Sequence, residues 1–225
     1  MSIEMEEADK VVRKPVLDNM VSVHMERWED KMDKKLLEDI TDIVDRAIIF
    51  ATFAHKNARR KSSTLPYIIH PLEAGAIAAS MTEDRKVIAA AILHDVVEDT
   101  EYTQEDIGEL FGQDVMKLNM ADTENKRSDL PPAETWKIRK QETIDYLLEK
   151  ATYKEKIIVL SDKLSNMRSI YNEHSAIGDK IWEKFNQKDK LQQKWYYESI
   201  LNVLNELEDT NAYKEYQQLV QSVFQ

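Results

Sequence analysis

The hydrophobic pattern of the chain is that of helices. Between Leu36 and Arg60, apolar residues recur at spacings of three and four, which predicts an amphipathic helix. Similar patterns predict further helices at residues 71–81, 85–100, 113–121, 132–150, 153–171, 180–208 and 210–225. Thr103 and Asp106 have the spacing of a capping box and predict the start of another helix. With only four glycines and five prolines, few turns are available, so we expect an all-α bundle of about ten helices.

Two parts of unequal length are expected. Residues 1–35 are densely charged, with apolar positions at helical spacing, and predict a charged helical N-terminal extension. Residues 36–225 are long enough to bury a sizeable core and are expected to form the main domain.

The composition and charge of the chain argue against several classes of function. The net charge of −11 argues against broad nucleic-acid binding, which favours a basic face. Neither a membrane-length apolar run nor a signal-peptide pattern occurs, so we expect a cytoplasmic protein with no membrane association. The chain has no cysteine, so a metal site would use nitrogen and oxygen ligands.

One stretch, Ile88–Thr100, combines an apolar helix pattern with a cluster of ionisable groups. An apolar run meets His94 and Asp95, and Glu98 and Asp99 follow one turn later. On one continuous helix these four side chains would share an arc of roughly 140°. Burying them unpaired would be costly, and a divalent cation is the simplest partner that would offset the cost.

Two other positions supply similar chemistry. His70 precedes Pro71, which disfavours a helical His70 and places it at a loop-to-helix junction. Asp162 lies on a later apolar helix, with Asn166 one turn away on the same face. His70, His94, Asp95 and Asp162 are therefore the candidate ligands, and such a set suits Mn²⁺, Fe²⁺, Zn²⁺ or Mg²⁺.

The order of these residues resembles that of HD-domain metal-dependent phosphohydrolases. Five stretches, at residues 60–62, 66–71, 93–100, 111–112 and 160–168, are similar to the hydrolase domain of the RelA/SpoT alarmone enzymes. The pair Glu98-Asp99 after His94-Asp95 is particular to that branch. Fewer than about sixty residues follow Arg168, too few for a synthetase domain of typical size. We therefore expect a stand-alone small alarmone hydrolase of the bacterial and metazoan (Mesh) type.

The resemblance implies an activity and a role for each residue. The reaction would remove the 3′-pyrophosphate of the guanosine nucleotide ppGpp or pppGpp, giving GDP or GTP and pyrophosphate, with one Mn²⁺ per site as the usual cofactor. The four candidate ligands would hold the metal, and Glu98 and Asp99 would position water and transfer protons. The implied nucleotide contacts are Arg60, Lys61, Asn166 and Tyr196. Lys137, Arg139 and Lys140 are candidate phosphate contacts by position alone.

Other functions remain possible because the sequence departs from the motifs of these hydrolases at positions on the substrate side. The departures are at residues 63–65, at residues 119–126 and at Gln192. One alternative is therefore a phosphatase that acts on another nucleotide, for example by removing the 2′-phosphate of NADPH. A catalytically silent HD domain, binding only a nucleotide or a partner protein, would predict loss of a ligand or of Glu98-Asp99, and none is lost. The basic cluster at residues 56–61 could be substrate-binding or simply a helix-dipole partner. The oligomeric state is open.

Overall fold

A computed structural model describes residues 37, 39–60, 64–120, 127 and 129–225 of the protein. The chain divides into two units, residues 1–39 and residues 40–225. The predicted helical extension at 1–35 lies outside the described residues, as does Lys61. The extension and the role of Lys61 therefore stay predictions.

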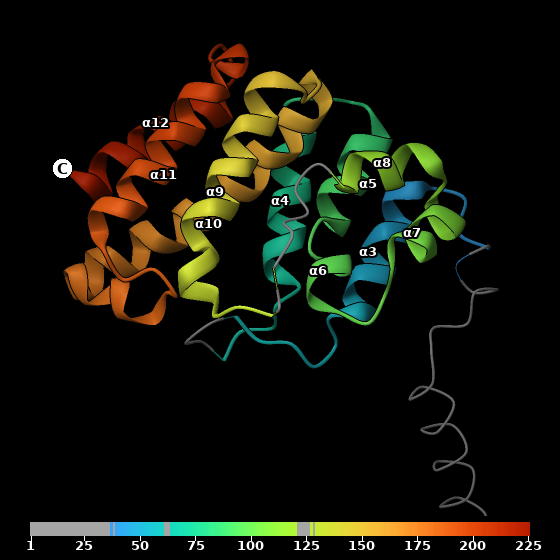
Figure 1. The fold of residues 1–225 in the computed structure, drawn as a ribbon. Coiled ribbons are helices and arrows are strands. Elements are labelled where there is room, and N and C mark those ends of the chain that lie inside the picture. The colour runs from blue at the N-terminus through green and yellow to red at the C-terminus, as the bar shows by residue number, and fades with distance from the viewer. Residues whose placement is uncertain (1–36, 38, 61–63, 121–126, 128) are drawn as a thin grey trace, which may run out of the picture. The chain divides into compact units, whose positions relative to one another are not determined.

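The described part of the second unit is helical, as predicted (Figure 1). Its elements are α3 (Ile43–Ala54), α4 (Ile69–Ala79), α5 (Arg85–Leu93), α6 (Val96–Asp99), α7 (Gln104–Phe111), α8 (Gln113–Met120), α9 (Pro132–Glu149), α10 (Tyr153–Ile177), the 3-10 helix η1 (Gly178–Lys184), α11 (Lys190–Val203), the 3-10 helix η2 (Asn205–Leu207) and α12 (Asn211–Phe224). The capping box predicted at Thr103 is present at the start of α7. No helix in the described ranges is long and apolar enough to cross a membrane.

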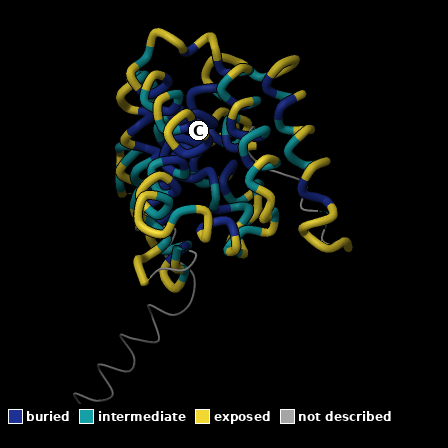
Figure 2. Tube along the Cα trace, turned by 90° about the vertical axis from the view of Figure 1, so that its left-hand side faces the viewer, coloured by how far each residue is buried: buried dark blue, intermediate teal, exposed yellow. Residues whose placement is uncertain are grey.

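Helix α10 is the centre of the bundle. Every residue from Lys156 to Ser165 is buried, so the helix is covered on all sides along this stretch. It packs against α4 and α5 on one side and against α12 on another (Figure 1). Figure 2 shows the same arrangement as a buried interior with exposed residues along the outer helices. Polar residues in the buried stretch of α10 are thus held in a fixed, largely dry environment.

A glycine brings α4 and α5 together. A Cβ atom added to Gly75 of α4 would overlap the side chain of Ile92 on α5. The missing side chain lets the two helices approach closely. Since His70 belongs to α4 and His94 directly follows α5, this approach brings the two histidines together.

Two predicted helix boundaries beside the candidate ligands were wrong. The continuous helix expected through Ile88–Thr100 is interrupted, because α5 ends at Leu93 and α6 begins at Val96. His94 Nδ1 bonds to the carbonyl of Ala91, the acceptor that an unbroken helix would use for the amide of Asp95. His70 was expected before a helix but lies in the first turn of α4. The following proline is tolerated there because the first amides of a helix have no intrahelical acceptor.

Candidate active site

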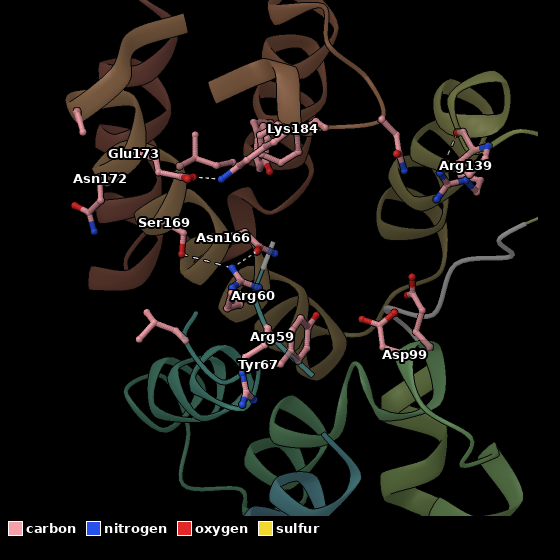
Figure 3. Close-up of a pocket in the computed structure, with 18 residues that line it drawn as sticks. Arg59, Arg60, Tyr67, Asp99, Arg139, Asn166, Ser169, Asn172, Glu173 and Lys184 are labelled. Atoms are coloured by element: carbon pink, nitrogen blue, oxygen red, sulfur yellow. Dashed lines mark hydrogen bonds and ion pairs between the residues drawn. The ribbon is translucent and has the colours of Figure 1, made fainter. Parts of the chain in front are cut away.

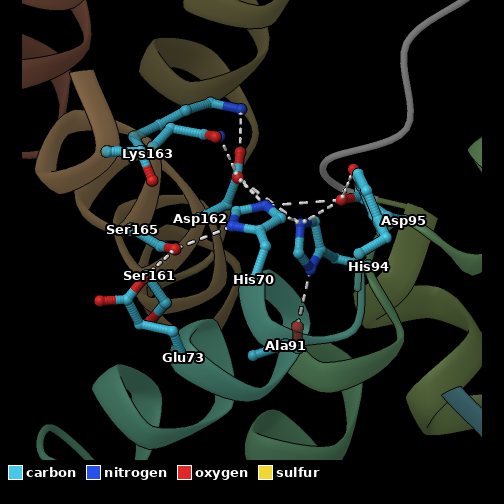
Figure 4. A network of polar contacts seen from close by, with 12 residues as sticks. His70, Glu73, Ala91, His94, Asp95, Ser161, Asp162, Lys163 and Ser165 are labelled. Carbon is cyan, nitrogen blue, oxygen red and sulfur yellow. Dashed lines mark hydrogen bonds and ion pairs between the residues drawn. The ribbon is translucent and has the colours of Figure 1, made fainter. Parts of the chain in front are cut away.

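Four predicted ligands from three parts of the chain meet at one point (Figure 4). The Nε2 atoms of His70 and His94 are 3.2 Å apart. Asp162 Oδ1 lies 3.0 Å from Nε2 of His70 and 3.5 Å from Nε2 of His94. Asp95 Oδ2 lies 3.5 Å and 3.0 Å from the same two nitrogens. His70, His94 and Asp162 are buried.

These separations fit the ligands of a single cation. Nitrogen and oxygen ligands that bind one ion at about 2.0–2.2 Å, at octahedral (90°) or tetrahedral angles, lie about 2.8–3.6 Å from one another. The distance between the two Nε2 atoms falls in that range, and so do the distances from each Nε2 atom to Asp95 Oδ2 and to Asp162 Oδ1. The donor set contains no sulfur and suits a divalent cation with nitrogen and oxygen preference.

Both histidines are oriented through the ring nitrogen that points away from this cluster. His94 Nδ1 is 2.8 Å from the carbonyl oxygen of Ala91, which can only accept, so Nδ1 carries the proton. His70 Nδ1 is 2.8 Å from the hydroxyl of Ser165. Such partners set the tautomer of a metal-binding histidine and fix the orientation of its ring.

The two carboxylates are held by neighbours as well. The hydroxyl of Tyr67 donates to Asp95 Oδ2 at 2.7 Å. Lys163 forms an ion pair with Asp162 Oδ2, and Asn166 Nδ2 donates to Asp162 Oδ1 at 2.6 Å. Because each carboxylate is anchored by a hydrogen bond from the protein, little side-chain freedom would be lost on binding an ion.

The electrostatic field of the cluster favours positive charge. Burial lowers the pKa of His94, but the carboxylates of Asp95 and Asp162 outweigh this effect and raise the pKa well above its usual value. Burial raises the pKa of Asp162, but Lys163 and the two histidines outweigh burial and hold the pKa well below its usual range. A field that stabilises a proton on an imidazole also stabilises a cation in the same place.

The structure has a pocket of about 950 Å³, whose lining residues are drawn in Figure 3. Tyr67 and Asn166, which hold the two carboxylates, also line this pocket, as do Glu98 and Asp99. Cationic side chains in its wall are Arg59, Arg60, Arg139 and Lys184. The pocket therefore combines acidic groups with several positive groups that suit an anionic ligand.

Asn166 links the pocket to the cluster. Its Oδ1 accepts a hydrogen bond from Arg60 Nη2 at 3.2 Å, while its Nδ2 donates to Asp162. Arg60 also reaches the hydroxyl of Ser169 at 3.5 Å and stands over the ring of Tyr67. One amide thus couples a cation of the pocket wall to a carboxylate of the cluster.

Comparison with known proteins identifies the family. The family model described as "HD domain" matches residues 47–192, which is more than half of the chain. The chain belongs to the HD domain family. The prediction of an HD-domain fold from the His and Asp pattern is confirmed.

Relatives of this HD domain come from bacteria and animals. The zebrafish (Danio rerio) guanosine-3′,5′-bis(diphosphate) 3′-pyrophosphohydrolase MESH1 is 34% identical over 133 residues, which cover 58% of this chain and 70% of MESH1. GTP pyrophosphokinase rsh of Brucella melitensis is 35% identical over 130 residues, covering 57% of this chain but only 17% of the Brucella protein. A solved structure of a metazoan ortholog of SpoT, which hydrolyzes ppGpp and plays a role in starvation responses, matches with a TM-score of 0.64 at 26% identity, covering 81% of this chain and 96% of that one.

Several residues predicted for the site of this HD domain lie at the pocket. They are Glu98, Asp99, Arg60, Arg139 and Asn166. Lys137 and Tyr196 are not brought there. Lys137 Nζ stands over the ring of Trp195, and Tyr196 is buried with its ring against Trp136. It is the next residue, Tyr197, that lines the pocket.

The sequence pattern did not reveal the side chains that support the ligands. Tyr67 belongs to the motif at residues 66–71, but nothing in its position along the chain shows that its hydroxyl reaches Asp95. Ser165 lies three residues after Asp162, hence near it on the same face of α10, and this spacing could have identified it. Lys184 and Phe185 reach the pocket from the irregular segment around η1, and no periodicity predicts that.

Proposed function

We propose that this protein hydrolyses the 3′-pyrophosphate of the alarmone ppGpp or pppGpp, giving GDP or GTP and pyrophosphate. The observation that carries the proposal is the cluster of His70, His94, Asp95 and Asp162 beside a pocket with both acidic and basic walls. Similarity to MESH1, named as a 3′-pyrophosphohydrolase of guanosine-3′,5′-bis(diphosphate), supports the choice of nucleotide.

His70, His94, Asp95 and Asp162 would hold one divalent ion, and we propose Mn²⁺. Two imidazoles and two carboxylates are compatible with that ion, which is also the usual cofactor of the enzymes that the motifs resemble. A bound divalent cation supplies Lewis-acid polarisation of a phosphoryl oxygen and lowers the pKa of water. The neighbours of these ligands, Tyr67 among them, keep the donor atoms aimed at one point.

Glu98 and Asp99 are the proposed groups for positioning water and transferring protons. Both lie in the pocket wall, and neither is one of the four proposed ligands. Carboxylates beside a reacting phosphate can accept a proton from the attacking water and return one to the leaving group. Their place at the pocket, outside the ligand cluster, separates proton transfer from metal binding.

Arg60 and Asn166 are the proposed contacts for the nucleotide. Their side chains are already paired with each other, and Asn166 is bonded to Asp162. A nucleotide bound at Arg60 would therefore lie beside the ligand cluster, with its reacting phosphate within reach. Arg59, Arg139 and Lys184 are further cations for phosphate oxygens.

The test is a side-by-side turnover assay of the full chain with Mn²⁺ on ppGpp, pppGpp and NADPH. We expect release of pyrophosphate from the two guanosine nucleotides, with GDP or GTP as the second product. A Glu98→Gln protein, purified in parallel, controls for contaminating hydrolases and should show almost no turnover. Release of monophosphate alone, or turnover of NADPH only, would show that the proposed substrate is wrong.

A further inference from the structure

A chain of hydrogen bonds leads from His70 to the last helix of the protein. His70 Nδ1 lies 2.8 Å from Ser165 Oγ, which lies 2.6 Å from Glu73 Oε2 (Figure 4). Arg168 Nη1 donates to Glu73 Oε1 at 3.0 Å. The same guanidinium binds both carboxylate oxygens of Glu215 at 2.6 and 2.7 Å. These contacts join α4, α10 and α12.

The direction of each bond follows from what the groups can donate. The carboxylate of Glu73 only accepts, so the single hydroxyl proton of Ser165 points to Glu73. Ser165 Oγ must then accept from His70, which places a proton on His70 Nδ1. The lone pair of the neutral imidazole is left on Nε2, the atom that faces His94 and Asp162.

The far end of the chain of bonds fixes the orientation of Glu73. Arg168 holds Glu73 Oε1, which leaves Oε2 for Ser165. The bidentate pair with Glu215 in turn holds the guanidinium in its plane. Glu215 belongs to α12, which lies beyond residues 47–192, the part matched by the HD domain model. A helix outside the matched region thus contacts Arg168, one of the residues that orient the candidate metal ligand His70.

We propose that Ser165, Glu73, Arg168 and Glu215 are positioning residues that hold His70 as the Nδ1-protonated tautomer, with Nε2 free for the metal. The inference rests on the metal site of the proposed function and is independent of the nucleotide. It assigns α12 a role in supporting the active site. It also explains two polar residues, Ser165 and Glu73, to which the proposed reaction gives no part.

Glu73→Gln is the most informative variant, because it should reverse the direction of the hydrogen bonds at Ser165 while keeping the size of the side chain. The guanidinium of Arg168 can only donate hydrogen bonds, so the amide oxygen of the glutamine should face Arg168. The NH₂ group of the glutamine would then face Ser165. Ser165 would then donate to His70 Nδ1 and shift the ring proton to Nε2. Glu73 is one-third exposed, so this change should leave the fold intact.

The first measurement is the tautomer of His70 in metal-free protein, read from ¹⁵N imidazole NMR spectra at alkaline pH. We expect the Nδ1–H form in the wild type and a shift toward the Nε2–H form in Glu73→Gln. The second measurement is Mn²⁺ affinity by chelator competition. Loss of such supporting contacts typically weakens metal binding by about 10- to 100-fold. We expect a loss in this range for Glu73→Gln and Ser165→Ala, and a smaller loss for Glu215→Gln.

Glu206→Gln is the matched control. It removes the 2.8 Å ion pair between Glu206 and Lys156. Lys156 also belongs to α10, but this ion pair is not part of the hydrogen-bond chain from His70 to Glu215. Its Mn²⁺ affinity and its His70 spectrum should equal those of the wild type. An unchanged tautomer and affinity in Glu73→Gln, or an equal loss of affinity in Glu206→Gln, would overturn the proposal. Wild-type protein that binds no Mn²⁺ would instead show that the proposed metal site is wrong.

Discussion

Binding of a metal ion should stabilise the fold by an amount that depends on Asp162 and not on Glu98. Two matched changes test this, because Asp162→Asn and Glu98→Gln each turn a carboxylate into an amide of the same size. Asp162 faces both histidines of the cluster, whereas Glu98 lines the pocket. We expect Asp162→Asn to remove most of the metal-linked stabilisation, and Glu98→Gln to keep it while losing turnover.

The size of the effect follows from linkage. An ion that binds only the native state, at a free concentration of a hundred times its Kd, stabilises the protein by about 2.7 kcal/mol. In a chain of this length, 1 kcal/mol moves the Tm by about 2–4 °C, so the wild type should gain about 5–11 °C. If Asp162→Asn weakens binding a hundredfold, about 0.4 kcal/mol remains at the same ion concentration. That corresponds to a Tm shift of only about 1 °C.

The assay is calorimetric unfolding of chelator-stripped protein with and without buffered Mn²⁺. Each variant is compared with its own metal-free Tm, because Asp162→Asn also removes a buried ion pair with Lys163. Loss of one charge of a buried ion pair is destabilising, so the metal-free Tm of this variant should fall. The quantity of interest is the shift that the ion adds to that lower baseline.

Two results would refute this reasoning. A full Mn²⁺ shift in Asp162→Asn would show that this carboxylate is not needed to hold the ion. An equal loss of the shift in Glu98→Gln would show that the pocket carboxylate also holds the metal, and the division between metal binding and proton transfer would fail.

Three further predictions concern the surroundings of the site. Gly75→Ala should lower the free energy of unfolding by about 1–3 kcal/mol, because its methyl group overlaps a buried side chain of α5; urea denaturation measures this, and an unchanged midpoint would contradict the close approach. Tyr67→Phe should weaken Mn²⁺ binding by about tenfold through loss of its hydrogen bond to a ligand carboxylate; affinity equal to the wild type, measured by chelator competition, would exclude that role. Arg139→Ala should raise the KM for ppGpp, while Lys137→Ala should leave it near the wild-type value; equal effects of the two in steady-state kinetics would mean that the pocket wall is misassigned.

The fold class and the family were predictable because each depends on features that are visible directly in the sequence. Helical periodicity and the scarcity of turn residues indicated an all-α bundle, and the structure confirms it. The candidate ligands were predictable because few residue types bind metals and each stands out in an apolar stretch. Asp162 is an example, since it is buried within a run of α10 that is otherwise mostly apolar.

The pocket wall could not be predicted as reliably, because it depends on how each helix is rotated in the bundle. Successive residues of a helix point about 100° apart, so an error of one residue changes which side chain reaches the pocket. Tyr196 was the expected nucleotide contact, yet Tyr197 is the pocket residue, and the ring of Tyr196 packs on Trp136. Lys137 is similar, because its position over the Trp195 ring depends on the packing of α9 against α11.

The interruption between α5 and α6 shows how two predicted ligands come together although the predicted local structure was wrong. In a continuous helix, the side chains of His94 and Asp95 would diverge by about 100°. In the structure, Nε2 of His94 and Oδ2 of Asp95 are 3.0 Å apart. Asp95 has φ −93° and ψ −5°, in the bridge region where many active-site residues lie. The break in the helix therefore brings the donor atoms of two adjacent residues to one place, and the local helix rule fails at the candidate site.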